Sequence, residues 1–125
     1  MDYFTVTQKE GSFTIDAFVG RLGEDLVVVL HGGEGHIGAV GMAQPRQSLQ
    51  DAKKTSSTSS VFTYTGHKED VLAKEMSEEL SKKLNKKVVV VAGIHWDGLK
   101  KREIESILQV CKKLTTVIIR EVLKK

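Results

Sequence analysis

The chain has 125 residues, of which 40% are hydrophobic and 28% are charged. These proportions are typical of a globular domain, and a chain of this length can bury a core without disulfide bonds. The single cysteine, Cys111, excludes an internal disulfide and any zinc site built on paired cysteines. We therefore expect one domain over residues 1–125.

The charge is uneven along the chain. Residues 1–65 carry five basic and seven acidic side chains, whereas residues 66–125 carry fourteen basic and nine acidic ones. The lysines of the second half alternate with glutamates and have no aromatic platform, so we interpret them as solvated helix faces rather than a nucleic-acid-binding surface. The sequence shows no signal-peptide pattern and no apolar run near the ~20 residues of a membrane span. A cytoplasmic protein that binds neither membrane nor nucleic acid is expected.

The first half of the chain is predicted to form strands joined by tight turns. Residues 3–7 and 12–19 alternate polar and apolar side chains around a turn at 8–11, and a second turn follows at 20–25. Residues 26–30 and 37–43 are the next two predicted strands. Both are apolar on both faces, which is typical of strands at the centre of a sheet.

A glycine-rich segment separates these last two strands and has a histidine on each side. We predict that Gly32 to Gly35 form the turn of a β-hairpin, which places His31 opposite His36. Side chains at such a cross-strand pair lie roughly 5 Å apart at Cβ. The two imidazoles are then close enough to share a metal ion or a ligand.

The second half is predicted to combine strands with helices. Pro45 is expected to end its strand, and the polar residues 46–60 to form a loop. A strand at 60–65, an amphipathic helix at 68–84, a buried strand at 87–93 and a helix at 100–123 follow. The apolar stripe of the last helix consists of Ile104, Ile107, Leu108, Cys111, Leu114, Ile118 and Val122. Further apolar residues off this stripe (Val110, Val117 and Ile119) indicate a subunit interface, and hence a homo-oligomer.

This order predicts an α+β fold: a mainly antiparallel sheet of about six strands, two helices on one face, and a C-terminal βαβα portion. That portion can contain a right-handed βαβ unit, in which both strands end at the same edge of the sheet. His67 and His95 follow those two strands. Each is therefore expected at this edge, just before a helix.

Two helix N-termini at one edge would present free N–H groups that favour a phosphate or a carboxylate. If the turn at 32–35 lies there too, all four histidines converge with Glu34, Glu69 and Asp97. Imidazole with carboxylate suits manganese, iron, zinc or nickel. Taken singly, His67 and His95 are better explained as caps or surface residues, and Asp97 as a helix cap. The joint pattern indicates a shared metal or anion site.

Two other motifs favour different chemistry. Residues 33–38 match GxGxxG, but the dinucleotide-binding motif requires a helix at that turn, and Gly38, Gly41 and Pro45 argue against one. Cys111 lies in the middle of a helix on an apolar stripe, and no serine lies in a nucleophile elbow. Nucleophilic catalysis is therefore disfavoured.

Three segments resemble a known family, the prenylated-flavin chaperone LpdD-like proteins, which are small D subunits of gallate- and vanillate-type hydroxyarylic acid decarboxylases. The segments are residues 32–40, 66–70 and 91–97, and the likeness extends from Gly20 through the last helix. Lys100 departs from the pattern, since Ser or Thr is expected there as part of a capping box. The resemblance implies one LpdD-like domain that handles prenylated FMN for a UbiD-type decarboxylase and has no turnover of its own.

The residues and the resemblance together give a candidate site. A flavin nucleotide offers a phosphate to the helix N-termini and an apolar ring to the glycines, and a divalent metal could bridge phosphate and protein. The predicted residues for binding prenylated FMN or FMN are Gly32, Gly33, Gly35, Gly38, His67, Lys68 and His95. The predicted metal ligands are His36, His67, His95, His31, Glu69 and Asp97. The alternative is a small metal-dependent enzyme of hydrolase type, in which Glu34, Glu69 or Asp97 acts as general base to a metal-bound water.

Overall fold

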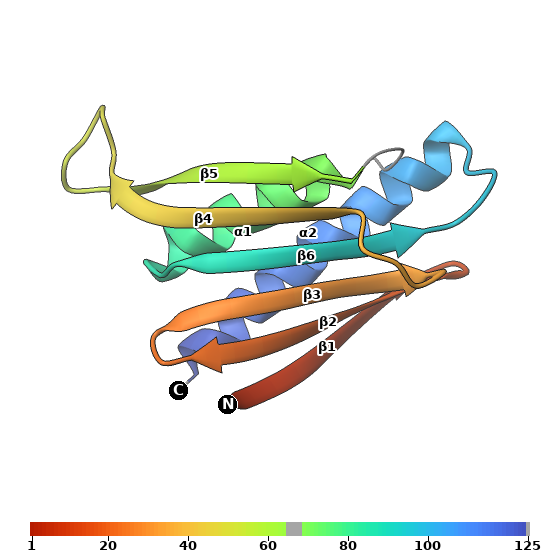
Figure 1. Ribbon diagram of the computed structural model, residues 1–125, viewed down its shortest axis with the longest axis horizontal. Coiled ribbons are helices and arrows are strands. Elements are labelled where there is room, and N and C mark those ends of the chain that lie inside the picture. The colour runs from red at the N-terminus through yellow and green to blue at the C-terminus, as the bar shows by residue number, and fades with distance from the viewer. Residues whose placement is uncertain (65–68, 125) are drawn as a thin grey trace.

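The computed structural model describes residues 1–64 and 69–124, which form one six-stranded sheet with two helices behind it (Figure 1). The strands of the first half are β1 (Asp2–Glu10), β2 (Phe13–Leu22), β3 (Asp25–Gly33), β4 (Ala39–Gln47) and β5 (Thr55–Thr63). They are followed by α1 (Asp70–Leu84), β6 (Val88–His95) and α2 (Lys101–Leu123). The predicted α+β fold is confirmed.

The order of strands across the sheet is β1-β2-β3-β6-β4-β5. Neighbours are antiparallel except β3 and β6, which are parallel. The chain passes from β5 through α1 to β6, as predicted for the C-terminal portion, but β4 lies between these two strands. Since β5 and β6 run in the same direction, both end at the same edge of the sheet, together with β3.

The predicted hairpin of residues 26–43 is wrong, because β6 lies between β3 and β4. His31 faces Asp16 of β2 and Gly93 of β6, not His36. The chain from β3 to β4 crosses the end of β6 instead of turning back. Two hydrogen bonds fix the crossing: the Glu34 N–H donates to the His95 carbonyl at 2.9 Å, and the Gly38 N–H to the Ala92 carbonyl at 2.9 Å.

The crossing depends on Gly93. A Cβ at this position would lie 2.0 Å from the carbonyl oxygen of His36, far inside van der Waals contact. Residues 88–91 of β6 are four consecutive valines, an apolar run that is typical of a strand at the centre of a sheet. β6 therefore takes the central position, and the glycine-rich segment passes over its end.

The predicted loop at 46–60 is also wrong in most of its length. Strand β4 continues through Pro45 to Gln47, and the serines and threonines from Thr55 onward form the edge strand β5. Pro45 is tolerated because the pairing of β4 with β6 ends at Ala43, so Pro45 has a neighbouring strand on one side only. Ser57 donates to the backbone carbonyl of Glu78 at 2.9 Å, and Ser59 donates to the Glu78 carboxylate. These hydroxyls attach β5 to α1.

The core lies between the sheet and the two helices. From α1 it includes Met76, Leu80 and Leu84, as the four-residue repeat predicts. The buried apolar stripe of α2 is Ile107, Val110, Cys111, Leu114, Ile118 and Val122. Two predicted details are wrong: Val110 belongs to this stripe, because it lies one turn from both Ile107 and Leu114, whereas Ile104, in the first turn, is 47% exposed. Leu108 is half-buried at the margin.

Helix α2 is amphipathic over its whole length. At its start Glu103 accepts a hydrogen bond from the Lys100 N–H at 2.9 Å, so the glutamate half of a capping box is kept although Lys100 replaces Ser or Thr.

Within residues 1–64 and 69–124, neither helix is long and apolar enough to cross a membrane.

Cys111 is buried in this core, and burial raises the pKa of its thiol to about 12. Since the thiolate is the reactive form, we expect the folded protein to resist alkylation by iodoacetamide at pH 8. The same reagent should modify Cys111 promptly in 6 M guanidinium chloride, and mass spectrometry follows both reactions. Equal labelling rates in the folded and unfolded chain would contradict this burial.

Candidate functional site

The candidate site is the sheet edge at which β3 and β6 end and β4 begins. The crossing segment between β3 and β4 carries Glu34 and His36 over this edge, and β6 ends at His95. Helix α1 begins beside it, with Glu69 at its N-cap position. The edge thus gathers residues that are distant in the sequence.

His36 and Glu69 form the most buried polar contact of this edge. Nε2 of His36 lies 2.8 Å from Oε2 of Glu69, and the exposed fractions of the two side chains are 19% and 9%. The carboxylate rests on Gly38, where a Cβ would lie 1.2 Å from Oε2. Gly38 therefore leaves the space that Glu69 fills.

Both ring nitrogens of His36 face acceptors. Nδ1 lies 3.2 Å from the Glu34 carbonyl oxygen, and Nε2 faces the Glu69 carboxylate. Both bonds can be made at once only when both nitrogens carry a proton, so the geometry favours the imidazolium. Burial lowers the pKa of His36, but the contacts with the Glu34 carbonyl and the Glu69 carboxylate outweigh it and raise the pKa above its ordinary value.

A second group lies nearer to solvent. Nε2 of His95 donates to Oδ1 of Asp97 at 2.9 Å. The ligand atoms of Glu34, His95 and Asp97 all lie within 4.8 Å of one another. One imidazole and two carboxylates at this spacing can surround one divalent cation.

The two groups adjoin. The rings of His36 and His95 are 5.4 Å apart between centroids and nearly perpendicular. The structure thus brings together Glu34, His36, Glu69, His95 and Asp97. The sequence analysis expected Glu34, Glu69 and Asp97 near these histidines, but not which side chains pair. The approach of Glu34 to His95 depends on β6 lying beside β3, and the pairing of His36 with Glu69 depends on α1 lying over β4.

Some of the glycines at this edge are covered by side chains. A Cβ at Gly32 would lie 2.9 Å from the indole of Trp96, and Gly33, with φ of 70°, also lies under Trp96. Trp96 in turn contacts Phe13 edge-on at 4.9 Å between centroids. Close packing thus accounts for Gly32 and Gly33, and their role in flavin binding stays a prediction. Beside Gly35, a Cβ would lie 3.7 Å from Nε2 of the His31 imidazole.

The remaining predicted residues are placed as follows. His31 is exposed on the helix-free face of the sheet and is not in the Glu34–His95–Asp97 group. His67 and Lys68 lie outside the described residues. His95 is the last residue of β6 and precedes α2 by six positions, so it is not at a helix N-terminus. The two helix starts already hold carboxylates, Glu69 at α1 and Glu103 at α2.

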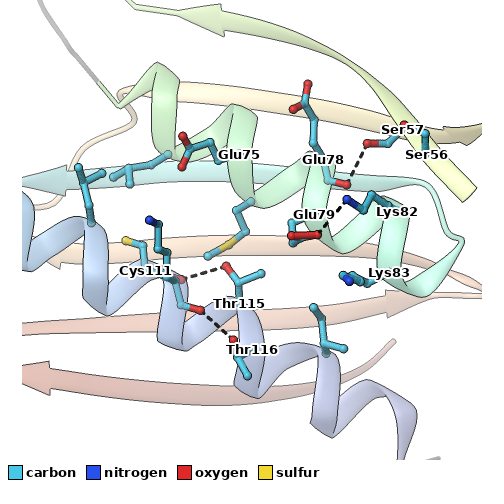
Figure 2. Close-up of a pocket in the computed structure, with 15 residues that line it drawn as sticks. Ser56, Ser57, Glu75, Glu78, Glu79, Lys82, Lys83, Cys111, Thr115 and Thr116 are labelled. Atoms are coloured by element: carbon cyan, nitrogen blue, oxygen red, sulfur yellow. Dashed lines mark hydrogen bonds and ion pairs between the residues drawn. The ribbon is translucent and has the colours of Figure 1, made fainter. Parts of the chain in front are cut away.

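A separate groove of about 880 Å³ runs between α1 and α2, away from these histidines (Figure 2). Its α1 side is charged, with Lys82 lying 3.9 Å from Glu79. On its α2 side Thr115 donates to the carbonyl of Cys111 at 2.9 Å. Its lining, taken over the described residues, contains none of the site residues that the sequence predicted.

Comparisons with known proteins agree with this fold. A solved structure described as a novel chaperone complex for yeast 20S proteasome assembly is similar, with a TM-score of 0.60 and 15% identity over 97% of this chain and 98% of that chain. At this identity the likeness shows the fold alone. No curated protein matches the chain significantly. The model of the prenylated flavin chaperone LpdD-like domain matches residues 9–123. The chain therefore belongs to the prenylated flavin chaperone LpdD-like domain family.

Proposed function

We propose that this protein binds prenylated FMN, or FMN, and serves a UbiD-type decarboxylase in the cytoplasm without catalysing a reaction itself. The family supports the flavin. The observation that carries the proposal is the convergence of Glu34, His95 and Asp97 at one sheet edge. In this proposal the three side chains hold a divalent metal, and the metal holds the phosphate of the flavin.

The charges at the edge fit a metal better than a bare phosphate. Glu34, Asp97 and Glu69 are acidic, and the positive charge of the His36 imidazolium balances that of Glu69. A divalent cation would balance the other two carboxylates and still attract a phosphate. A phosphate without a metal would meet the uncompensated negative charge of Glu34 and Asp97.

His36 has a positioning role in this proposal. As an imidazolium it offers no lone pair to a metal, and its bonds to Glu34 and Glu69 hold the crossing segment over β6. Glu34 is thereby kept facing His95. His67 and Lys68 stay predicted contacts of the phosphate, next to Glu69 in the sequence.

Isothermal titration calorimetry tests the site in two steps, with a divalent metal alone and then with FMN or its prenylated form. We expect His95→Ala to weaken binding of the metal at least 10-fold, because loss of one of three ligands removes much of the coordination. Flavin affinity should fall in parallel when metal is present. His67→Ala tests whether that residue contributes to the phosphate contact.

His31→Ala is the matched control, since it removes an imidazole from the same edge but outside the three-residue group. It should leave both affinities unchanged. Unchanged metal affinity in His95→Ala would contradict the metal site. Flavin affinity that is equal with and without metal would contradict the bridging role of the metal. It would not contradict the proposal that the protein binds a flavin.

A metal-dependent hydrolase is the second candidate. The observation that favours it is the exposure of the group: Glu34 and Asp97 are exposed and His95 is half-buried, so a metal there would keep a position open to water. Hydrolysis of p-nitrophenyl phosphate that needs added metal and is lost in His95→Ala would favour the enzyme over the chaperone. We expect no such turnover.

A further inference from the structure

The middle of the sheet face opposite the helices is mainly apolar from β1 to β5. Figure 1 looks onto this face, with both helices behind the strands. In the register of the sheet, one row of facing residues crosses all six strands. This row is Thr5, Phe18, Val29, Val91, Val40 and Phe62.

A second row lies two residues along each strand. It consists of Tyr3, Gly20, Val27, Val89, Met42 and Ser60. The two rows, which we call the bare face, contain no charged side chain. Three of their side chains project well into solvent: Phe62 is 65% exposed, Tyr3 62% and Met42 55%. Tyr3 stacks on Phe18 at 5.0 Å between ring centroids.

The whole helix-free side of the sheet has the area of a protein interface. Six strands ~4.8 Å apart and about nine residues long, at ~3.3 Å per residue, span roughly 700 Å², and the two rows of the bare face form the central part of this area. A standard interface buries about 800 Å² on each partner, whereas exposed apolar patches on monomers seldom exceed a few hundred Å². The bare face can therefore form the apolar centre of such an interface, with the polar ends of the strands around it.

We propose that two copies of this chain pack their bare faces together, so that the dimer is a sandwich of two sheets with the helices outside. Aligned sheets pack about 10 Å apart with their strands within about 30° of each other. An isologous contact of this kind needs no charge complementarity. The bare face offers no charge to an acidic or basic partner but matches an identical apolar sheet.

The shape of the bare face is complementary to that of a second copy, because it has both a projecting side chain and a hollow. A shallow hollow of about 320 Å³ beside Met42 is lined by Met42, Ser60 and Val89 of the bare face and, beyond it, by Lys87 and neighbouring residues. With the two-fold axis parallel to the strands, β1 of one copy lies over β5 of the other, and the projecting Tyr3 comes over this hollow. Both edges that carry Glu34, His95 and Asp97 then lie open at the same end of the sandwich.

This interface differs from the one that the sequence indicated on the last helix. Val110 is buried, and Val117 and Ile119 pack against the core of their own chain. These three side chains therefore contact their own chain, and the interface proposed here lies on the sheet instead.

Sedimentation equilibrium on the full chain tests the proposal. We expect the wild type to have a mass near twice the 13.8 kDa of one chain. Met42→Glu should weaken dimerisation at least 100-fold and give a folded monomer, because a carboxylate there is solvated in the monomer but buried in the sandwich. Phe62→Glu, on the edge strand, repeats the test at a second position. Circular dichroism verifies the fold of each variant.

Leu49→Glu is the matched control, since Leu49 is 93% exposed and lies outside the bare face. It should remain dimeric. A wild type that is monomeric at 100 μM would overturn the proposal, and so would a dimer that survives both Met42→Glu and Phe62→Glu. Loss of the dimer in Leu49→Glu as well would show that the effect does not come from the bare face, and would overturn it too.

Discussion

Replacing Leu114 by alanine is expected to lower the free energy of unfolding by about 2–5 kcal/mol, the range for a large apolar side chain removed from a close-packed core. Leu114 is 0% exposed in the middle of α2 and belongs to the hydrophobic core. Its removal loses apolar burial and leaves a cavity that the surrounding strands and helices cannot fully close. Urea denaturation of wild type and variant measures the difference.

Two other positions on the same helix, Leu123 and Ile104, serve as controls. Leu123 is 68% exposed, so Leu123→Ala should change stability by no more than about 0.5 kcal/mol. The sequence predicted Ile104 on the buried stripe, whereas the structure leaves it 47% exposed. Ile104→Ala should therefore destabilise the protein less than Leu114→Ala. A loss at Ile104 as large as that at Leu114 would contradict the placement of the helix.

Local periodicity predicted much of this fold. The alternation of Ile15, Ala17 and Val19 placed β2 with one face inward, and the stripes of both helices gave their buried sides within a few residues. Such patterns are local consequences of the two-residue repeat of a strand and the 3.6-residue repeat of a helix. They require no knowledge of which elements become neighbours.

The order of the strands could not be predicted in this way. A glycine-rich segment between two apolar strands is the usual pattern of a hairpin, and nothing within residues 26–43 reveals a third strand between them. The insertion of β6 depends on a contact between residues about sixty positions apart, such as Val28 and Val90. The serine-rich first half of β5 was taken for a loop for a related reason, because its hydroxyls are satisfied by Glu78 of a helix that follows it.

The candidate site was also predicted only in part, because some of its contacts are local and others join distant elements. That His36 and His95 meet follows from both lying beyond strand ends at one edge. That Glu69 pairs with His36 depends on α1 lying tightly over β4, where a Cβ at Gly41 would come within 2.5 Å of the Ala73 carbonyl oxygen. This close approach is a packing relation between separate elements, and the sequence alone shows only a glycine.

The pair of His36 and Glu69 should make the stability of the protein depend on pH. The raised pKa of His36 means that the folded chain holds this proton more tightly than the unfolded chain does. The resulting stabilisation is complete below about pH 6.5, the ordinary pKa of histidine, and is lost as pH rises through the raised value. In metal-free protein with EDTA, we expect His36→Gln to destabilise most at pH 6 and progressively less toward pH 9.

The expected loss near pH 6 is about 1–3 kcal/mol, because the substitution leaves the buried Glu69 carboxylate without its charged donor. Gly38→Ala provides an independent test, since the added methyl would overlap the position of Oε2 and displace the carboxylate while His36 stays in place. Urea denaturation from pH 6 to 9 should show a weaker pH dependence in this variant as well. The contrary outcome is a difference in unfolding free energy between wild type and His36→Gln that is the same at every pH. It would refute the His36 imidazolium. The contacts of His36 with the crossing segment would then be neutral hydrogen bonds.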